Sequence, residues 1–159
     1  MTTSRTQLTV TLATNQKAAL YIRQAGVHQT RLGNDLRKLY TELLLTFAHE
    51  MGWPDDLIII VNDSDIPASA PLEKREGLQQ LIRAIEQDEV KAVLLNIEHS
   101  LYRNATLVAI AIFMEQCKRH GVCVATPELV YDVSNPMHER LFRLSLESQT
   151  FFIYARTNG

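Results

Sequence analysis

Short apolar runs alternate along the chain with segments whose apolar residues recur at helical spacing. The apolar runs are residues 18–22, 57–61, 92–96 and 122–126. They show almost no alternation with polar residues, which is typical of strands buried on both faces of a parallel sheet. The amphipathic segments between them predict helices over about 34–51, 73–87 and 104–118, the first capped by Asn34 and the third by Asn104. The pattern predicts an α/β fold, a three-layer αβα arrangement around a mostly parallel central sheet.

The two ends of the chain differ from this central pattern. Residues 1–16 are polar and weakly alternating, and they are expected to form an N-terminal arm or edge strand. Residues 17–134 hold the α/β domain, and residues 135–159 are expected to form a long C-terminal helix that starts at Asn135 and Pro136.

The predicted C-terminal helix carries more apolar residues than one domain can cover. Residues 151–154 are four apolar residues in succession, so they cover every side of a helix. An exposed apolar surface of this kind favours self-association, and we expect a homodimer through this helix. The interface candidates are Leu141, Leu144, Phe151, Phe152 and Tyr154.

Composition and charge narrow the function classes. The chain has 159 residues, 46% of them hydrophobic, and no apolar stretch reaches the ~20 residues of a membrane span, so no membrane contact and a cytoplasmic location are expected. Cys117 and Cys123 are expected to be buried thiols, and no spacing of Cys or His residues predicts a metal or another cofactor. The net charge of -2 argues against strong autonomous DNA binding, so any contact with DNA should be weak or indirect.

Residues 21–29 read Tyr-Ile-Arg-Gln-Ala-Gly-Val-His-Gln, and they carry the most informative substitution in the chain. The segment resembles the catalytic domain of serine site-specific recombinases, the resolvase and invertase family, whose first strand ends in Tyr-x-Arg-x-Ser-x-x-x-Gln. Tyr21, Arg23 and Gln29 match this pattern, but Ala25 stands where the family has its nucleophilic serine.

The loop after the second predicted strand is similar to a second family motif, Asp-x-Gly-x-Ser-Gly-x-x-x-x-Arg-Pro-Gly. Residues 65–77 keep Asp65, Ser69, Arg75 and the last glycine of that motif. Proline and alanine replace its two earlier glycines, which predicts a stiffer loop.

A third family motif, Asp-Arg-Leu-x-Arg-Asn, resembles residues 99–104. Arg103 matches its second arginine, whereas His99 and Ser100 replace its aspartate and its first arginine. Asp132 to Pro136 resembles the segment that precedes the long helix through which family members dimerise and touch DNA.

The resemblance implies a DNA strand-exchange scaffold without its chemistry. In the family, the serine hydroxyl attacks a DNA phosphate and forms a covalent 5′-phosphoserine link, while arginines hold the phosphoryl oxygens. Loss of a serine nucleophile costs roughly 10⁶-fold in rate in a serine hydrolase. We therefore expect a recombinase-like pseudoenzyme that acts as an interaction or regulatory module, with an active recombinase subunit as a possible partner. Arg23, Arg75 and Arg103 are its phosphate-binding candidates.

Two other functions remain open at this point. A divergent but active DNA recombinase would need Ser69 or Ser100 as a substitute nucleophile. An anion- or nucleotide-binding α/β domain would use the carboxyl edge of the sheet, where ligands gather in open α/β folds. The aspartates at positions 55, 56, 63 and 65 are interpreted as solvated turn residues, and His28 and His99 as loop residues rather than metal ligands.

Overall fold

A five-stranded sheet in the order β2-β1-β3-β4-β5 forms the centre of the molecule. The structure, a computed structural model, describes residues 16–23, 31–63, 70–96, 101 and 107–146. The strands are β1 (Lys17–Ile22), β2 (Ile58–Asn62), β3 (Val90–Leu94), β4 (Cys123–Ala125) and β5 (Val130–Tyr131). The first four run parallel and β5 pairs antiparallel with β4, which confirms the prediction of a mostly parallel sheet.

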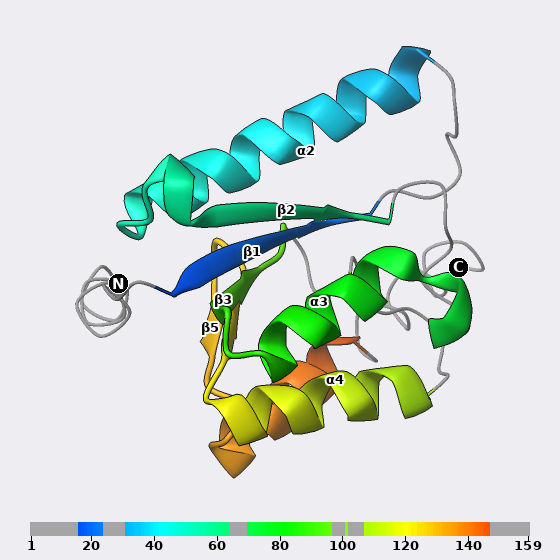
Figure 1. The fold of residues 1–159 in the computed structure, drawn as a ribbon, viewed down its shortest axis with the longest axis vertical. Coiled ribbons are helices and arrows are strands. Elements are labelled where there is room, and N and C mark those ends of the chain that lie inside the picture. The colour runs from blue at the N-terminus through cyan, green and yellow to red at the C-terminus, as the bar shows by residue number, and fades with distance from the viewer. Residues whose placement is uncertain (1–15, 24–30, 64–69, 97–100, 102–106, 147–159) are drawn as a thin grey trace, which may run out of the picture.

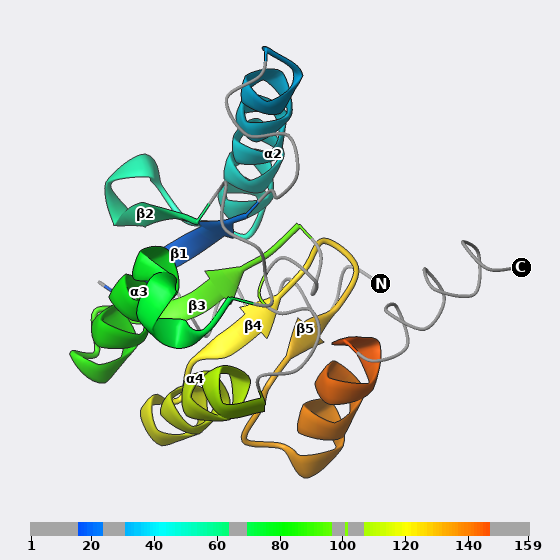
Figure 2. The ribbon, with the colours of Figure 1, turned by 90° about the vertical axis from the view of Figure 1, so that its right-hand side faces the viewer.

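Helices cover both faces of the sheet and produce three layers (Figure 1, Figure 2). Helix α2 (Arg31–Glu50) lies on one face, and α3 (Glu76–Glu86), α4 (Leu107–His120) and a further helix at residues 136–146 lie on the other. Short 3-10 helices, η1 (Asp55–Leu57) and η2 (Leu72–Lys74), precede β2 and α3. The three-layer αβα prediction is confirmed.

The core is divided in two by the sheet. Ala18, Leu20 and Ile22 of β1 pack with α2, whereas Ala19 and Tyr21 pack with the helices on the opposite face. All five of these side chains are almost completely buried. Burial on both faces explains why β1 appears in the sequence as an uninterrupted apolar run.

Several element boundaries differ from the predicted ones. Helix α2 begins at Arg31, so the prediction of Asn34 as its N-cap is wrong. Strand β3 starts at Val90, before the run that predicted it, and β5 was not expected at all. The helix cap predicted at Asn104 lies outside the described residues.

Cys117 and Cys123 are buried free thiols, as expected. Burial raises the pKa of both thiols, that of Cys123 to about 12, so neither is a thiolate at neutral pH. Within the described ranges, the helices lack the combined length and apolar character that crossing a membrane requires.

Candidate functional site

A buried polar network lies at the carboxyl ends of β1 and β2. Asp63 directly follows β2, and its backbone N–H donates to the carbonyl of Ile22 at 2.9 Å. The Tyr21 hydroxyl donates to Asp63 Oδ2 at 2.6 Å and accepts a hydrogen bond from Arg75 Nη2 at 2.6 Å. Tyr21, Asp63 and Arg75 are each at most 1% exposed, so this network forms in a low-dielectric interior where each such bond is strengthened.

The carboxylate of Asp63 also caps the start of α3. The backbone N–H of Gly77 donates to Asp63 Oδ1 at 2.6 Å, and that of Leu78 donates to Asp63 Oδ2 at 2.8 Å. A negative charge is stabilised at the N-terminus of a helix by its free amides and its dipole. In this protein the anion at α3 is an intramolecular carboxylate, which argues against an external phosphate at that position.

Gly77 is required by the close approach of this carboxylate. A Cβ at position 77 would lie 2.5 Å from Asp63 Oδ1 and 2.7 Å from Asp63 Cγ. Both distances are too short for real contacts, so any larger residue would push Asp63 away from the helix. The glycine that matched the family loop motif therefore has a packing role.

Burial keeps the Tyr21 hydroxyl protonated. Burial is the largest cause that raises the pKa of Tyr21 above its usual value, Asp63 raises it further, and Arg75 acts in the opposite direction. The guanidinium Cζ of Arg75 lies 5.8 Å from the centre of the Tyr21 ring, and its Nε lies 3.9 Å from Asp63 Oδ2. Tyr21 is therefore a hydrogen-bond donor to Asp63 at neutral pH.

The arginines predicted to hold phosphate differ in their placement. Arg75 is completely buried and contacts protein groups, so a direct contact with phosphate would require those groups to separate. Arg23 is half-buried and follows the last residue of β1. The structure brings Arg75 to Tyr21, but the remaining site candidates lie outside the described residues. They are Ala25, Gln29, Asp65, Ser69, His99, Ser100 and Arg103.

Asp63 is a structural residue that sequence reasoning missed. Its interpretation as a solvated turn residue is wrong, because it is 1% exposed. Asp55 and Asp56 are exposed, as expected. The signal that could have identified Asp63 is its position directly after a buried strand, where a side chain turns toward the elements that follow the strand.

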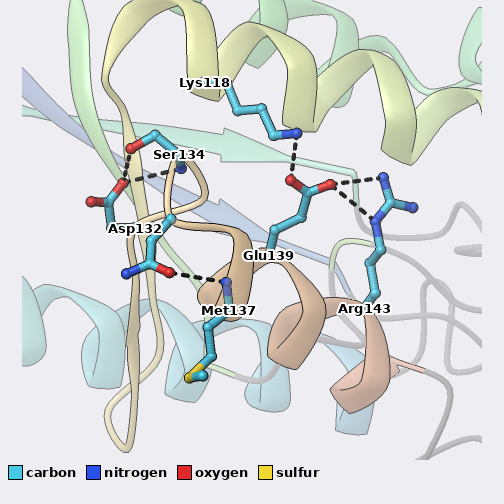
Figure 3. Close-up of polar contacts among 7 residues, drawn as sticks. Lys118, Asp132, Ser134, Met137, Glu139 and Arg143 are labelled. Atoms are coloured by element: carbon cyan, nitrogen blue, oxygen red, sulfur yellow. Dashed lines mark hydrogen bonds and ion pairs between the residues drawn. The ribbon is translucent and has the colours of Figure 1, made fainter.

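The helix at residues 136–146 is anchored at its start by local capping bonds (Figure 3). Asn135 Oδ1 accepts a hydrogen bond from the backbone N–H of Met137 at 2.9 Å, which confirms the predicted start of this helix. Asp132 Oδ1 accepts a hydrogen bond from the backbone N–H of Ser134 at 3.1 Å, and this bond shapes the preceding turn.

An ion pair then joins this helix to α4 (Figure 3). Glu139 pairs with Lys118 of α4 and accepts weaker bonds from Arg143, one turn further along its own helix, at 3.4 Å. These partners lower the pKa of Glu139, the hydrogen bond from Lys118 having the largest effect.

The outer side of the same helix is apolar. Met137, Leu141 and Leu144 are 69%, 50% and 47% exposed, whereas Phe142 and Leu146 are buried against the sheet. The exposed residues recur at a spacing of four and three, so they form one stripe. Leu141 and Leu144 were predicted as interface residues, while Phe151, Phe152 and Tyr154 lie outside the described part of the chain.

Comparison with known proteins assigns this architecture to a family. A family model described as "Resolvase, N terminal domain" matches residues 18–152. The N-terminal catalytic domain of TP901-1 integrase is similar in structure, with a TM-score of 0.59 and 19% identity over 88% of this chain and 98% of that one.

Two further solved structures show the same fold. One is the C-terminal catalytic domain of ISC1926 TnpA, an IS607-like serine recombinase, with a TM-score of 0.55 and 18% identity over 69% of each chain. The other is a serine recombinase from Sulfolobus solfataricus, with a TM-score of 0.52 and 21% identity over 70% of this chain and 67% of that one. At these identities the likeness concerns the fold.

Proposed function

We propose, from the premise that this chain belongs to the resolvase N-terminal-domain family, that it is a recombinase-type domain that does not cut DNA. It acts instead as an interaction or regulatory module, as a homodimer or in complex with an active recombinase subunit.

One observation supports the loss of cleavage above all others, the alanine at position 25. The family pattern has its nucleophilic serine there, and a methyl group has no lone pair with which to attack phosphorus. The aspartate and the first arginine of the third motif are missing as well, since His99 and Ser100 stand at their positions. Losses of a nucleophile (~10⁶-fold) and of a charge-stabilising donor (~10²–10³-fold) leave negligible turnover even if they are not additive.

The buried network supports the idea that the scaffold kept its shape without its chemistry. Tyr21, Asp63 and Arg75 link the ends of β1 and β2 to the start of α3. Arg23 directly follows Ile22, whose carbonyl accepts the backbone N–H of Asp63, so the network lies next to Arg23 in the chain. In this proposal Arg75 is a positioning residue, and Arg23 and Arg103 are the residues that bind a DNA phosphate.

The apolar stripe on the C-terminal helix supports the homodimer. Leu141 and Leu144 lie on the exposed side of a helix that capping bonds and the Lys118–Glu139 pair fix to the domain. A pre-formed apolar helix face is the kind of surface that a second helix covers. An active recombinase subunit with a similar helix would fit the same surface, and the resulting mixed dimer would contain only one nucleophile.

A covalent-capture assay tests the loss of cleavage. The protein is incubated with labelled DNA, the mixture is denatured, and label that stays with the protein is measured. We expect no retained label from the wild type or from Ala25→Ser alone, because His99 and Ser100 also replace the aspartate and the first arginine of the family motif. The combination of Ala25→Ser, His99→Asp and Ser100→Arg is the test of revival. A wild-type adduct that disappears in Ser69→Ala or Ser100→Ala would instead establish a divergent active recombinase.

A further inference from the structure

Strand β2 forms one edge of the sheet, and half of its backbone groups point away from the molecule. It pairs with β1 on one side, and no strand in the described part of the chain pairs with its other side. The backbone N–H of Asp63 points toward β1, since it donates to Ile22. Backbone groups alternate in direction along a strand, so those of Ile58 and Ile60 point outward from the edge.

This edge lacks the features that normally protect a sheet edge from other strands. Natural edges are shortened, bulged or given Lys and Pro residues. The opposite edge follows that rule, since β5 has only two residues. Strand β2 has the sequence Ile-Ile-Ile-Val-Asn, which contains no charge and no proline, and its pairing with β1 shows no bulge.

The side chain of Ile60 is left half-covered at this edge. Ile60 lies beside Leu20 in the sheet, and both are on the face that α2 covers. Leu20 is completely buried, whereas Ile60 is 47% exposed. An exposed β-branched residue in the middle of an unprotected edge strand is suited to cross-strand packing.

The other face of the same edge is hollowed. A groove of about 260 Å³ lies beside Ile59 and is lined by α3 residues that include Arg83 and Ala84, and by Glu89. Arg83 and Glu89 are both exposed, so the rim carries charges of both signs. A partner with the same rim can therefore place opposite charges together across a twofold axis.

We propose that β2 pairs antiparallel with β2 of a second copy of this chain, with Ile60 opposite Ile60 of that copy. The same strand is self-complementary in this register, because the outward residues Ile58 and Ile60 face outward residues of the partner. A twofold contact of this kind closes on itself and continues the sheet from one copy into the other.

This surface is distinct from the helix stripe of the proposed homodimer. Strand β2 is at one edge of the sheet, and the helix at residues 136–146 packs at the other, where the Phe142 ring meets the Tyr131 ring of β5 at 5.0 Å. The two contacts can therefore form at the same time, and the inference does not depend on whether the chain cleaves DNA.

Cysteine cross-linking of the full chain tests the register. In the proposed pair, the Cα atoms of the two Ile60 residues would lie ~5.5 Å apart, within the range that a disulfide spans. Two Asn62 residues would lie roughly 14 Å apart, because each is two residues from the axis. Ile60→Cys and Asn62→Cys are therefore matched test and control variants, and the wild type controls for its two buried cysteines.

Each variant is treated with diamide, which accepts the two electrons and two protons released by two thiols, and is then run on a denaturing gel without reductant. We expect Ile60→Cys to shift from the mass of one chain to that of two, with a yield that rises with protein concentration, and Asn62→Cys to remain at one. Equal cross-linking of both variants, or of neither, would overturn the proposal. An introduced thiol at position 60 that resists both diamide and maleimide would also overturn it, since another segment of the same chain would then cover the edge.

Discussion

The replacement of Asp63 by asparagine is the sharpest perturbation of the buried network. Asp63 accepts three hydrogen bonds, from the Tyr21 hydroxyl and from the backbone N–H groups of Gly77 and Leu78. Asparagine keeps the size of the side chain but has one acceptor oxygen instead of two. Its NH₂ group must then face one of these donors, which leaves two buried donors pointing at each other.

The expected cost follows from the bonds that are lost. A hydrogen bond to a charged acceptor contributes ~1.5–3 kcal/mol, and a buried donor left without an acceptor costs a further ~1–3 kcal/mol. We therefore expect Asp63→Asn to lower the free energy of unfolding by ~3–5 kcal/mol, a large fraction of the ~5–15 kcal/mol that stabilises a typical domain.

Urea unfolding followed by tryptophan fluorescence measures this cost. The chain has a single tryptophan, Trp53, which is 4% exposed in the core beside α2. Its emission therefore reports the loss of that core. With a urea dependence of ~1–3 kcal/mol/M, the midpoint of Asp63→Asn should fall by roughly 2 M.

Asp55→Asn is the matched control, because Asp55 pairs with His49 but its side chain is 85% exposed. Exposed ion pairs contribute ~0–1 kcal/mol, so this variant should unfold almost like the wild type. If Asp63→Asn also lay within ~1 kcal/mol of the wild type, the Asp63 carboxylate would not be what holds α3 to β1 and β2.

Other expected outcomes follow from the same contacts. Gly77→Ala should cost ~1–3 kcal/mol in urea unfolding through overpacking, and almost nothing in an Asp63→Ala background, where the new methyl group meets no carboxylate. Because the folded-state pKa of Glu139 is lowered, its contribution to stability should be complete above the ordinary glutamate pKa of ~4.3 and be lost as the pH falls below it. The difference in unfolding free energy between wild type and Glu139→Gln should therefore shrink on acidification, and a difference that grows would contradict the assignment. Leu141→Lys should reduce the mass measured by sedimentation equilibrium, whereas Leu129→Lys, with a similar exposure of 54%, should leave it unchanged.

The layers of the fold could be predicted because burial on both faces removes the alternation of polar and apolar residues from a strand. Strand β1 shows this directly, since its successive side chains enter two different cores. Strand β5 could not be predicted in this way, because two residues are too few to show any period. The start of α2 was misplaced at Asn34, since a good capping residue can also lie inside a helix.

The candidate site was less predictable than the fold. The family resemblance identified Tyr21 and Arg75, and the structure joins them by a hydrogen bond. The resemblance could not show that Arg75 is buried, because its burial depends on how the segment before α3 packs against the ends of β1 and β2. Asp63 was missed for a related reason, since its partner amides lie 14 and 15 residues further along the chain.

Capture of a covalent protein–DNA product is the most direct test of the central claim, which is that a recombinase scaffold has lost its nucleophile. The wild-type protein would be incubated with end-labelled, sheared genomic DNA from its own organism, denatured, and resolved on a gel. We predict no label at the mass of the protein, because Ala25 cannot form a phosphoester. A labelled band that survives denaturation and disappears on protease treatment would show that the chain still cleaves DNA, and would contradict the account.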